Sequence, residues 1–301
     1  MLLSEPLRPA RDTNLQLFLD ADYLAYEIGS LSEYSTFPTE FPLKKGEYER
    51  VCIDEHRDIW KWIEPVGLVD WKIDNAINLL KDRFETEALH VYLTGSGNFR
   101  ERVAKTRPYK ANRKAAKPHY WQYIRDQLIG RHNATIIDGI EADDEVSIMQ
   151  MNTIVPHVVC CNDKDLRNTP GYLYLPDKRK QLLRIHPSYA QFHFLQQMVV
   201  GDRVDNIPGL PRRGIAWFNS KANSVDNLAD LREIIYNEYI KKDHTGDLLL
   251  EQGRLLHMMR HDNDVWSPHT DYTEDAPCAN KLIAPAEHLR SPYDIVEEEA
   301  A

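Results

Sequence analysis

The sequence lacks the long apolar run, about 18 residues, that a membrane-spanning helix needs. Its first residues, MLLSEPLRPAR, are too short and too interrupted for a secretory signal peptide. The four cysteines form no CxxC pair and have no histidine nearby at zinc spacing. These absences predict a soluble, cytoplasmic protein without a structural zinc site. In such a protein we expect the adjacent Cys160 and Cys161 to be reduced and buried.

Other familiar chemistry is also missing, because the twelve histidines are scattered and no Ser/His/Asp arrangement or glycine-rich nucleotide loop is recognisable. Positive charge is scarce as well, and the net charge of −10 at first argues against a nucleic-acid partner. That charge is unevenly distributed, however. Residues 100–117 carry eight lysines and arginines against one acid, so the local charge there suits a polyanion.

Five apolar runs have the length of strands, and they are continuous rather than alternating, as in strands covered on both faces. They are residues 15–21, 88–94, 134–138, 154–161 and 171–175. Segments with helical spacing lie between them, at 70–85, 119–130 and 142–152. This alternation predicts an α/β fold with a mostly parallel central sheet flanked by helices.

Beyond residue 187 the pattern becomes helical, and the string GDRVDNIPGLPRRG predicts tight turns between helices. We therefore expect an α/β core at 1–187 and, at 188–301, a helical subdomain that ends in a solvated tail from about 268. Residues 31–65 are rich in Pro, Glu and Tyr without clear periodicity. We expect a long excursion there.

Carboxylates cluster at the ends of the apolar runs. The nine acids are Asp20 and Asp22; Glu141, Asp143 and Asp144; Asp163 and Asp165; and Asp202 and Asp205. A turn, a helix cap or complementation of a helix dipole would explain each cluster alone. Together, at the carboxyl edge of a parallel sheet, they would repel one another unless cations were bound. Because Mg²⁺ prefers oxygen ligands, the joint pattern favours a magnesium site.

Four of these acidic strings, LDADYLAYE, GIEADDE, NDKDL and GDRVDNIPG, occur in an order that resembles the bacteriophage 5′-nucleases. They also resemble the 5′-nuclease domain of bacterial DNA polymerase I, a relative of the flap endonucleases. The string NFRERVAKTRPYKANRK is similar to the helical arch, or gateway, of that family, here about 99–130. The match covers roughly 15–215, and a weaker likeness to T7-like phage exonucleases continues near 253–268. The resemblance implies a PIN-like 5′-nuclease fold whose C-terminal helical subdomain binds DNA through a helix–three-turn–helix-like element.

The resemblance also implies an activity, a metal-dependent 5′ to 3′ exonuclease or flap endonuclease that hydrolyses phosphodiester bonds near 5′ ends. Its substrates would be duplex, nicked or flapped DNA, or RNA primers in RNA:DNA hybrids, during replication in a phage-infected bacterial host. The implied cofactor is two or more Mg²⁺ ions, with Mn²⁺ able to substitute, and the implied enzyme is a monomer. Two alternatives stay open, a PIN-type ribonuclease and a non-catalytic relative that binds DNA structures.

Site residues are carried over from the family motifs by position. First-site metal ligands would be Asp20, Glu141, Asp143 and Asp163; second-site ligands would be Asp165, Asp202 and Asp205, with Asp144 in the outer shell. Lys110 matches the lysine that contacts the scissile phosphate. Arg113, three residues later, would share its helix face. Further candidates for nucleic-acid binding are Arg100 on phosphate, Tyr109 as a stacking ring, and Lys114.

Two departures from the family pattern stand out. Gly95 occupies the position of an aspartate found in many relatives, and we hypothesise that Asp22 supplies the missing charge. The family's glycine-rich turn is replaced by PGLPRRGIAW, whose Pro211 removes a backbone N–H. Potassium binding at 209–214 is therefore doubtful. Arg212 and Arg213 would supply the phosphate contacts instead, as side chains.

Overall fold

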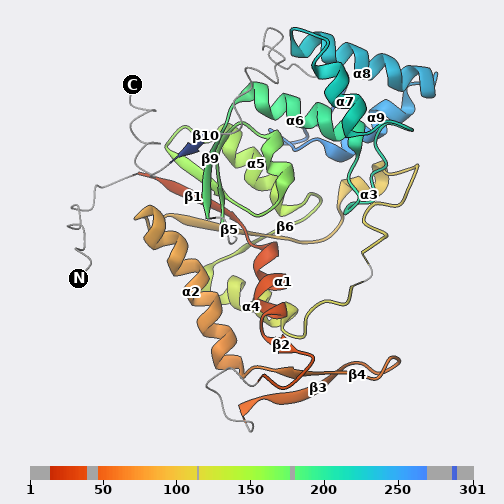
Figure 1. The fold of residues 1–301 in the computed structure, drawn as a ribbon. Coiled ribbons are helices and arrows are strands. Elements are labelled where there is room, and N and C mark those ends of the chain that lie inside the picture. Colours follow the sequence, from red (N-terminus) through yellow and green to blue (C-terminus); the bar gives the residue numbers. More distant parts are fainter. Residues whose placement is uncertain (1–13, 39–46, 114, 177–179, 270–286, 290–301) are drawn as a thin grey trace, which may run out of the picture.

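A seven-stranded sheet forms the centre of the molecule (Figure 1). The computed structural model describes residues 14–38, 47–113, 115–176, 180–269 and 287–289. The strands are β1 (Gln16–Asp20), β5 (Leu89–Thr94), β6 (Thr135–Ile137), β7 (His157–Cys160), β8 (Gly171–Leu175), β9 (Gln181–Ile185) and β10 (Glu287–Leu289). Their order is β10-β9-β8-β7-β1-β5-β6. All pairs are parallel except β8 with β9 and β9 with β10. The predicted α/β class with a mostly parallel sheet is confirmed.

Helices cover both faces of this sheet, as the continuous apolar strands require. Successive side chains of β1 point to opposite faces. Leu17 and Leu19 pack against helices on one face, and Phe18 packs toward the other. On the first face lie α1 (Asp22–Ser30), α2 (Val66–Phe84) and α4 (Trp121–His132), and on the second lies α5 (Ala142–Asn152). All three strand residues are fully buried, and the helices at 70–85, 119–130 and 142–152 form close to where the sequence predicted them.

Residues 31–65 leave the central sheet, as the expected excursion does, but their described part has regular structure. They form a small antiparallel sheet of β2 (Glu33–Tyr34), β4 (Ile59–Ile63) and β3 (Glu49–Asp54) at one end of the molecule (Figure 1). Its strands lie at the surface, so the sequence shows no clean alternation of buried and exposed positions. Aromatic packing stabilises it, with the rings of Phe37 and Trp62 5.3 Å apart.

Four helices gather at the opposite end of the molecule (Figure 1). They are α6 (Pro187–Val200), α7 (Ile215–Ala222), α8 (Leu228–Lys242) and α9 (Asp247–Leu256). Their own core includes Phe194, Phe218 and the fully buried Trp266. A Cβ at Gly253 would lie 2.0 Å from the Trp266 ring, so α9 approaches that ring only through a glycine. Among the described helices, none is long and apolar enough to cross a membrane, and the predicted tail falls largely outside the described residues.

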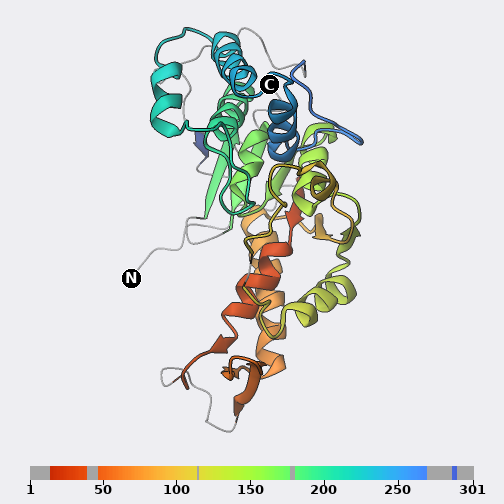
Figure 2. The same cartoon turned by 90° about the vertical axis from the view of Figure 1, so that its right-hand side faces the viewer.

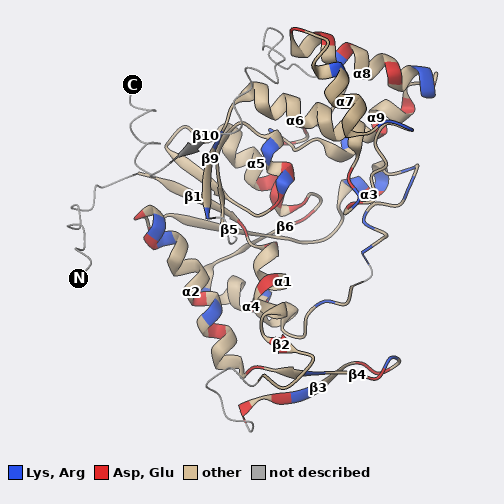
Figure 3. Cartoon of the chain, in the orientation of Figure 1, with Lys and Arg blue, Asp and Glu red and all other residues tan. Residues whose placement is uncertain are grey.

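One long segment connects these two ends along the side of the sheet, as Figures 1 and 2 show. After α3 (Phe99–Val103), the described part of residues 104–120, which we call the strap, contains no helix. The predicted helical arch is therefore wrong over this stretch. Pro108 and the left-handed backbone of Lys110, φ 54°, prevent a continuous helix. Positive charge is concentrated along the strap (Figure 3).

Candidate metal and nucleic-acid site

An acidic cavity of about 470 Å³ lies at the carboxyl edge of the parallel strands. The topology brings its walls together, because β1 ends at Asp20, β7 ends three residues before Asp163, and Glu141 is the N-cap residue of α5. The lining carboxylates are Asp20, Asp22, Glu141, Asp143 and Asp163, and Lys110 and Arg113 of the strap face them. The sequence predicted this gathering, and the structure places five of the nine clustered acids there.

Three of the five acids have no cation as an ion-pair partner among the described residues. Asp20, Asp143 and Asp163 each accept a backbone N–H from one or two residues further along the chain, at 2.7–3.0 Å. Asp20 also accepts the thiol of Cys161, 3.1 Å away. Both Cys160 and Cys161 are free and buried, as expected. Asp20 is buried, Asp143 is partly buried and Asp163 is more open, and all three carboxylates accept hydrogen bonds from neutral donors only.

Because these three carboxyl groups are at least partly shielded from water and lack a counter-charge, their pKa values are raised. Burial, followed by repulsion from Asp22, raises the pKa of Asp20 to about 7. The pKa of Asp163 rises to about 6 for the same first reason, with Asp165 as the repelling neighbour. Burial and Glu141 raise the pKa of Asp143 well above its usual value. In these three carboxylates the ionised form is disfavoured by desolvation and by repulsion from neighbouring carboxylates. A bound divalent cation would remove both of these costs, and it prefers such hard oxygen donors.

The other two cavity acids are already neutralised by basic side chains. Glu141 pairs with Lys110, and this contact lowers the pKa of Glu141 although burial opposes it. Asp22 pairs with Arg125 of α4 at 2.7 Å. Asp205, outside the cavity lining, pairs with Arg113 at 2.5 Å. Lys110 and Arg113 thus converge on neighbouring carboxylates as predicted from their spacing, but from a turn rather than a helix.

Arg100 and Asp144 form a buried ion pair next to the cavity wall, where Nη1 of Arg100 also lies 3.6 Å from Oε2 of Glu141. The Nη2 of Arg100 lies 2.8 Å from Oδ1 of Asp144 and 2.8 Å from the carbonyl of His257, and its Nε donates to Leu255 at 3.0 Å. Arg100 is 2% exposed and Asp144 is fully buried. The predicted phosphate contact of Arg100 has no support in this arrangement. Arg100, which we predicted to contact DNA, instead links α3 to α5 and α9.

The predicted second metal set lies beside the cavity rather than in it. Lys164 bridges Asp165, 2.8 Å away, and Asp202. Asp202 and Asp205 belong to the turn that follows α6. Across the described chain, no three His, Cys, Asp or Glu side chains stand close enough together to form a ready-made metal site. Binding at Asp165, Asp202 and Asp205 therefore stays a prediction, and it requires Lys164 to leave at least one of them.

Tyr109 does not present an open ring for base stacking. Its hydroxyl lies 2.7 Å from Oε2 of Glu141 and 2.9 Å from Oδ2 of Asp205, so its single proton is donated to one of them at a time. Its ring packs against the core of the helical end. Tyr109 thus holds two acids together. Lys114 lies outside the described residues.

The surroundings of Gly95 explain why no carboxylate stands there. A Cβ at Gly95 would lie 2.3 Å from Oδ1 of Asp138 and 2.9 Å from the carbonyl of Ile137. Asp22 lies at the same edge, where it accepts the N–H of Thr94 at 3.2 Å. The position that we assigned to Asp22 is therefore correct, but its charge is shared with Arg125. A role for Asp22 as a metal ligand stays a prediction.

Sequence reasoning missed three residues of the cavity wall. Lys117, Trp121 and Arg125 are spaced four residues apart, which was the available signal, and all three line the acidic cavity. Lys117 Nζ lies 3.3 Å from the centre of the Trp121 ring, and Arg125 lies over the same ring at 4.8 Å. Arg125 also donates to the carbonyl of Thr94 at 2.6 Å. It therefore links α4 to the end of β5.

The turn between α6 and α7 holds the two predicted arginines differently. Arg213 pairs with Glu238 of α8 at 2.7 Å, whereas Arg212 is exposed. A Cβ at Gly209, φ 70°, would lie 2.4 Å from the backbone nitrogen of Gly201, so the turn closes on itself tightly. Phosphate binding by Arg212 and Arg213, and the doubtful potassium site, stay predictions.

A parallel sheet with acids at its carboxyl edge, a basic strap and an attached helical end is a fold of the 5′-nuclease type. Among solved structures, bacteriophage T5 5′-exonuclease with bound zinc has the same fold, with a TM-score of 0.57 and 13% identity. A complex of bacteriophage T5 flap endonuclease with DNA and metal ions has a TM-score of 0.55 and 12% identity. Each alignment covers 81% of this chain and 89% of the other. No protein-family model matches the sequence, and no curated protein matches it either.

Proposed function

We propose that this protein is a divalent-metal-dependent 5′-nuclease that hydrolyses phosphodiester bonds near the 5′ ends of DNA. The observation that carries the proposal is the acidic cavity, where three carboxylates without an ion-pair partner face the cations of the strap. The bacteriophage T5 structures support it, because one of these similar proteins was solved with DNA and metal ions. The finer substrate range, including RNA primers in RNA:DNA hybrids, belongs to the proposal.

The donor set of the cavity fits the metal. Asp20, Asp143 and Asp163 would hold a first Mg²⁺ after moving closer together, since all three are oxygen donors that lack a cationic ion-pair partner. When bound, divalent ions polarise a phosphoryl oxygen and make water a stronger nucleophile. Glu141 would join this set after giving up its contact with Lys110. The carboxylates thereby position the reacting groups.

The strap supplies the positive charge. Lys110 and Arg113 line the cavity together with the acids, so a phosphate that enters it meets both positive charges. A phosphate competes with Glu141 and Asp205 for these cations. Arg113 presents a planar pair of donors suited to phosphate, and Lys110 acts as a point charge. Both would neutralise the scissile phosphate and orient it.

A panel of substrates labelled at the 5′ or the 3′ end tests the proposal. It should contain blunt duplex, nicked and flapped DNA and an RNA:DNA hybrid, each with Mg²⁺ or Mn²⁺. Asp163→Asn and Lys110→Ala should each reduce kcat by at least about a hundredfold, since one loses a metal ligand and the other a phosphate contact. Lys81→Ala on α2, whose ammonium pairs with Glu87 outside the cavity, is the matched control.

The outcomes separate the alternatives. Cleavage restricted to RNA strands would favour a PIN-type ribonuclease. Tight binding to flaps or nicks without cleavage in either metal would favour a non-catalytic DNA-structure-binding protein. Unchanged cleavage by both variants would overturn the site assignment even if the wild type is active.

A further inference from the structure

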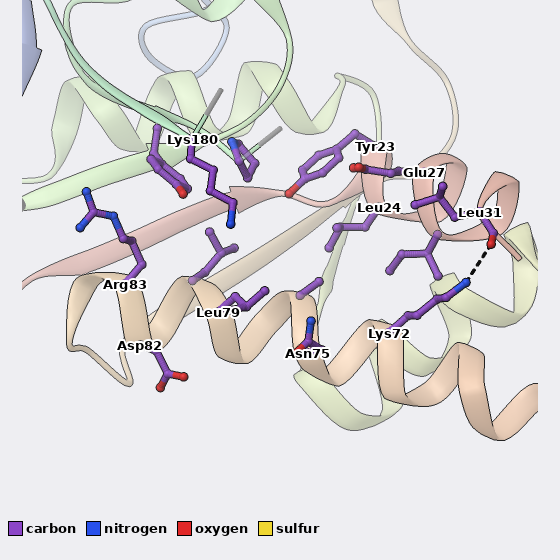
Figure 4. Close-up of a pocket in the computed structure, with 15 residues that line it drawn as sticks. Tyr23, Leu24, Glu27, Leu31, Lys72, Asn75, Leu79, Asp82, Arg83 and Lys180 are labelled. Carbon is purple, nitrogen blue, oxygen red and sulfur yellow. Dashed lines mark hydrogen bonds between the residues drawn. The ribbon is translucent and has the colours of Figure 1, made fainter. Parts of the chain in front are cut away.

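A second cavity, of about 540 Å³, lies between α1, α2 and the ends of β8 and β9 (Figure 4). It is separate from the acidic cavity, although Tyr23 lines both. Its walls are mainly apolar, with Leu24 and Ile28 of α1 opposite Leu79 of α2. Its volume falls in the range of small-molecule sites, about 300–1,000 Å³. Leu79 is 52% exposed, so the cavity leaves a large apolar side chain open to solvent.

Two cations stand at the rim of this cavity without a carboxylate partner among the described residues. They are Arg83 of α2 and Lys180 at the edge of β9. Figure 4 shows the ammonium of Lys180 directed into the cavity above Leu79. Lys72, a third cation of the lining, is instead tied to Glu64 at 2.6 Å. Two carboxylates, Glu27 and Asp82, line the cavity as well, but Figure 4 shows Asp82 directed away from it and Glu27 beyond Tyr23. The apolar floor beside Arg83 and Lys180 therefore suits a ligand with a flat apolar body and an anionic group.

The polar groups of the cavity narrow the ligand class further. The hydroxyl of Tyr23 forms no hydrogen bond with the described residues, and Figure 4 shows it beside the cavity. The amide of Asn75 points toward the same space, and Tyr174 adds a second aromatic ring. An aromatic ring with a nearby amide and hydroxyl can stack on a heterocyclic base and bond its edge.

We propose that this cavity binds a nucleoside 5′-monophosphate, with its base against Tyr23 and Leu79 and its phosphate on Arg83 and Lys180. The choice of a nucleotide rests on the proposed function, since water that attacks the phosphate and displaces the 3′ oxygen would leave products with a 5′ phosphate. Tyr23 lies in the first turn of α1, directly after Asp22 of the acidic cavity. A bound nucleotide would therefore contact the helix that borders the acidic cavity.

Equilibrium dialysis of the full chain against labelled dTMP, and separately against AMP, tests this site. The buffer contains EDTA, so that no divalent metal brings the phosphate to the acidic cavity. Arg83→Ala and Lys180→Ala should each raise the Kd about tenfold, the loss of one charge-assisted hydrogen bond. Leu79→Trp should fill the cavity and abolish binding. Lys81→Ala, on the same helix but outside the cavity, should leave the Kd unchanged.

Further arms define the contacts. Thymidine and inorganic phosphate should each bind at least about tenfold more weakly than dTMP, because each lacks one half of the ligand. Equal binding by either would overturn the proposed pose. A 5′-phosphorylated oligonucleotide distinguishes a free nucleotide from a strand end, and tighter binding of the oligonucleotide than of dTMP through Arg83 and Lys180 would contradict the proposal. So would binding that is lost in Lys110→Ala but kept in Arg83→Ala.

Failure of this inference can be told apart from failure of the proposed function, because the binding assay requires no catalysis. A wild type that cleaves DNA but binds no dTMP at about 1 mM overturns the nucleotide site alone. A wild type that cleaves no substrate yet binds dTMP through Arg83 and Lys180 overturns the nuclease and keeps the site.

Discussion

At the scale of single residues, position 95 shows how a missing side chain can be a structural requirement. The neighbours of Gly95 include the carbonyl of Ile137 and the methyl of Ile136, which a Cβ would approach to 2.9 Å and 2.8 Å. These atoms belong to β6 and to its backbone, which cannot move aside easily. The absence of an acid at this position therefore follows from close packing of β5 against β6. It is not evidence against catalysis.

We predict that Gly95→Ala destabilises the protein by about 1–3 kcal/mol, the usual cost of an atom forced into a packed site. Gly130→Ala is the matched control, because a Cβ at Gly130 meets nothing within 4 Å and the residue lies inside α4. That variant should be more stable by about 0.5–1 kcal/mol, since alanine restricts the unfolded chain and favours helix. Unfolding in urea measures both. If Gly95→Ala left the free energy of unfolding unchanged, β6 would have to move aside to accommodate the added Cβ.

Asp22 invites a second test at this scale. Its pair with Arg125, which is 8% exposed, implies that Asp22→Asn leaves a nearly buried guanidinium without its counter-ion. We expect a loss of about 1–3 kcal/mol in the free energy of unfolding, and a much smaller loss in the double variant with Arg125→Met. Isothermal titration with Mg²⁺ gives the second readout. A large loss of metal affinity with unchanged stability would make Asp22 a ligand rather than part of an ion pair.

At the scale of elements, the sequence predicted best where one physical rule dominates. Continuous apolar runs are explained only by burial on both faces, so β1, β5, β7 and β8 were found close to their observed bounds. β9 was missed because its polar Arg184 interrupts a short run at the antiparallel side of the sheet. The strap was predicted as a helix because its string resembles the helical arch of the 5′-nuclease family. Its conformation is determined by a contact with a residue that is distant in the sequence.

Glu251 of α9 is the distant residue that fixes the start of the strap. One of its oxygens accepts the backbone N–H groups of Lys105 at 2.8 Å and Thr106 at 2.7 Å, and the other accepts the hydroxyl of Thr106. A carboxylate buried to 9% exposure that binds two amides replaces the hydrogen bonds that a helix would have made. Local sequence contains no sign of this contact, which spans more than 140 residues.

Glu251→Gln should free the start of the strap, because a neutral amide accepts these N–H groups more weakly and adds donors without partners. We expect faster tryptic cleavage after Lys105 and a drop in kcat, with metal affinity unchanged because the acids of the cavity are untouched. Glu233→Gln on the exposed side of α8 is the control. Unchanged proteolysis would show that Pro108 and the turn at 201–206 hold the strap without Glu251.

At the scale of the whole molecule, the candidate site depends on contacts between the sheet and the helical end. The sequence could predict that acids converge at the carboxyl edge, since parallel strands impose it. It could not predict which acids would be paired, because Arg100, Lys110 and Lys164 come from segments whose paths depend on the complete fold. The topology of the sheet therefore determines where the acids of the site lie, whereas ion pairs between distant segments determine which of these acids are neutralised.

The contacts between the sheet and the helical end include a partly buried histidine, so the free energy of unfolding should depend on pH. His193 of α6 is partly buried, and its Nδ1 lies 2.7 Å from Oδ1 of Asn168, which follows the third acidic cluster. Burial, followed by repulsion from Arg167 and Lys164, lowers the pKa of His193 to about 3. The unfolded chain, with a histidine pKa near 6.5, therefore binds a proton that the folded protein rejects.

The contribution of His193 to the free energy of unfolding is therefore greatest above pH 6.5, and it decreases as the pH drops from 6.5 toward 3. We expect His193 alone to remove about 1 kcal/mol of unfolding free energy per pH unit in that range. His193→Gln keeps a donor for Asn168 but cannot titrate, so urea unfolding at pH 7.5, 6 and 5 should show a shallower decline than in the wild type. His261→Gln, at an exposed position, should leave the slope unchanged. Parallel declines in all three proteins would place the acid sensitivity elsewhere, in the buried pair of His257 and Asp264, where burial also lowers the pKa of the histidine.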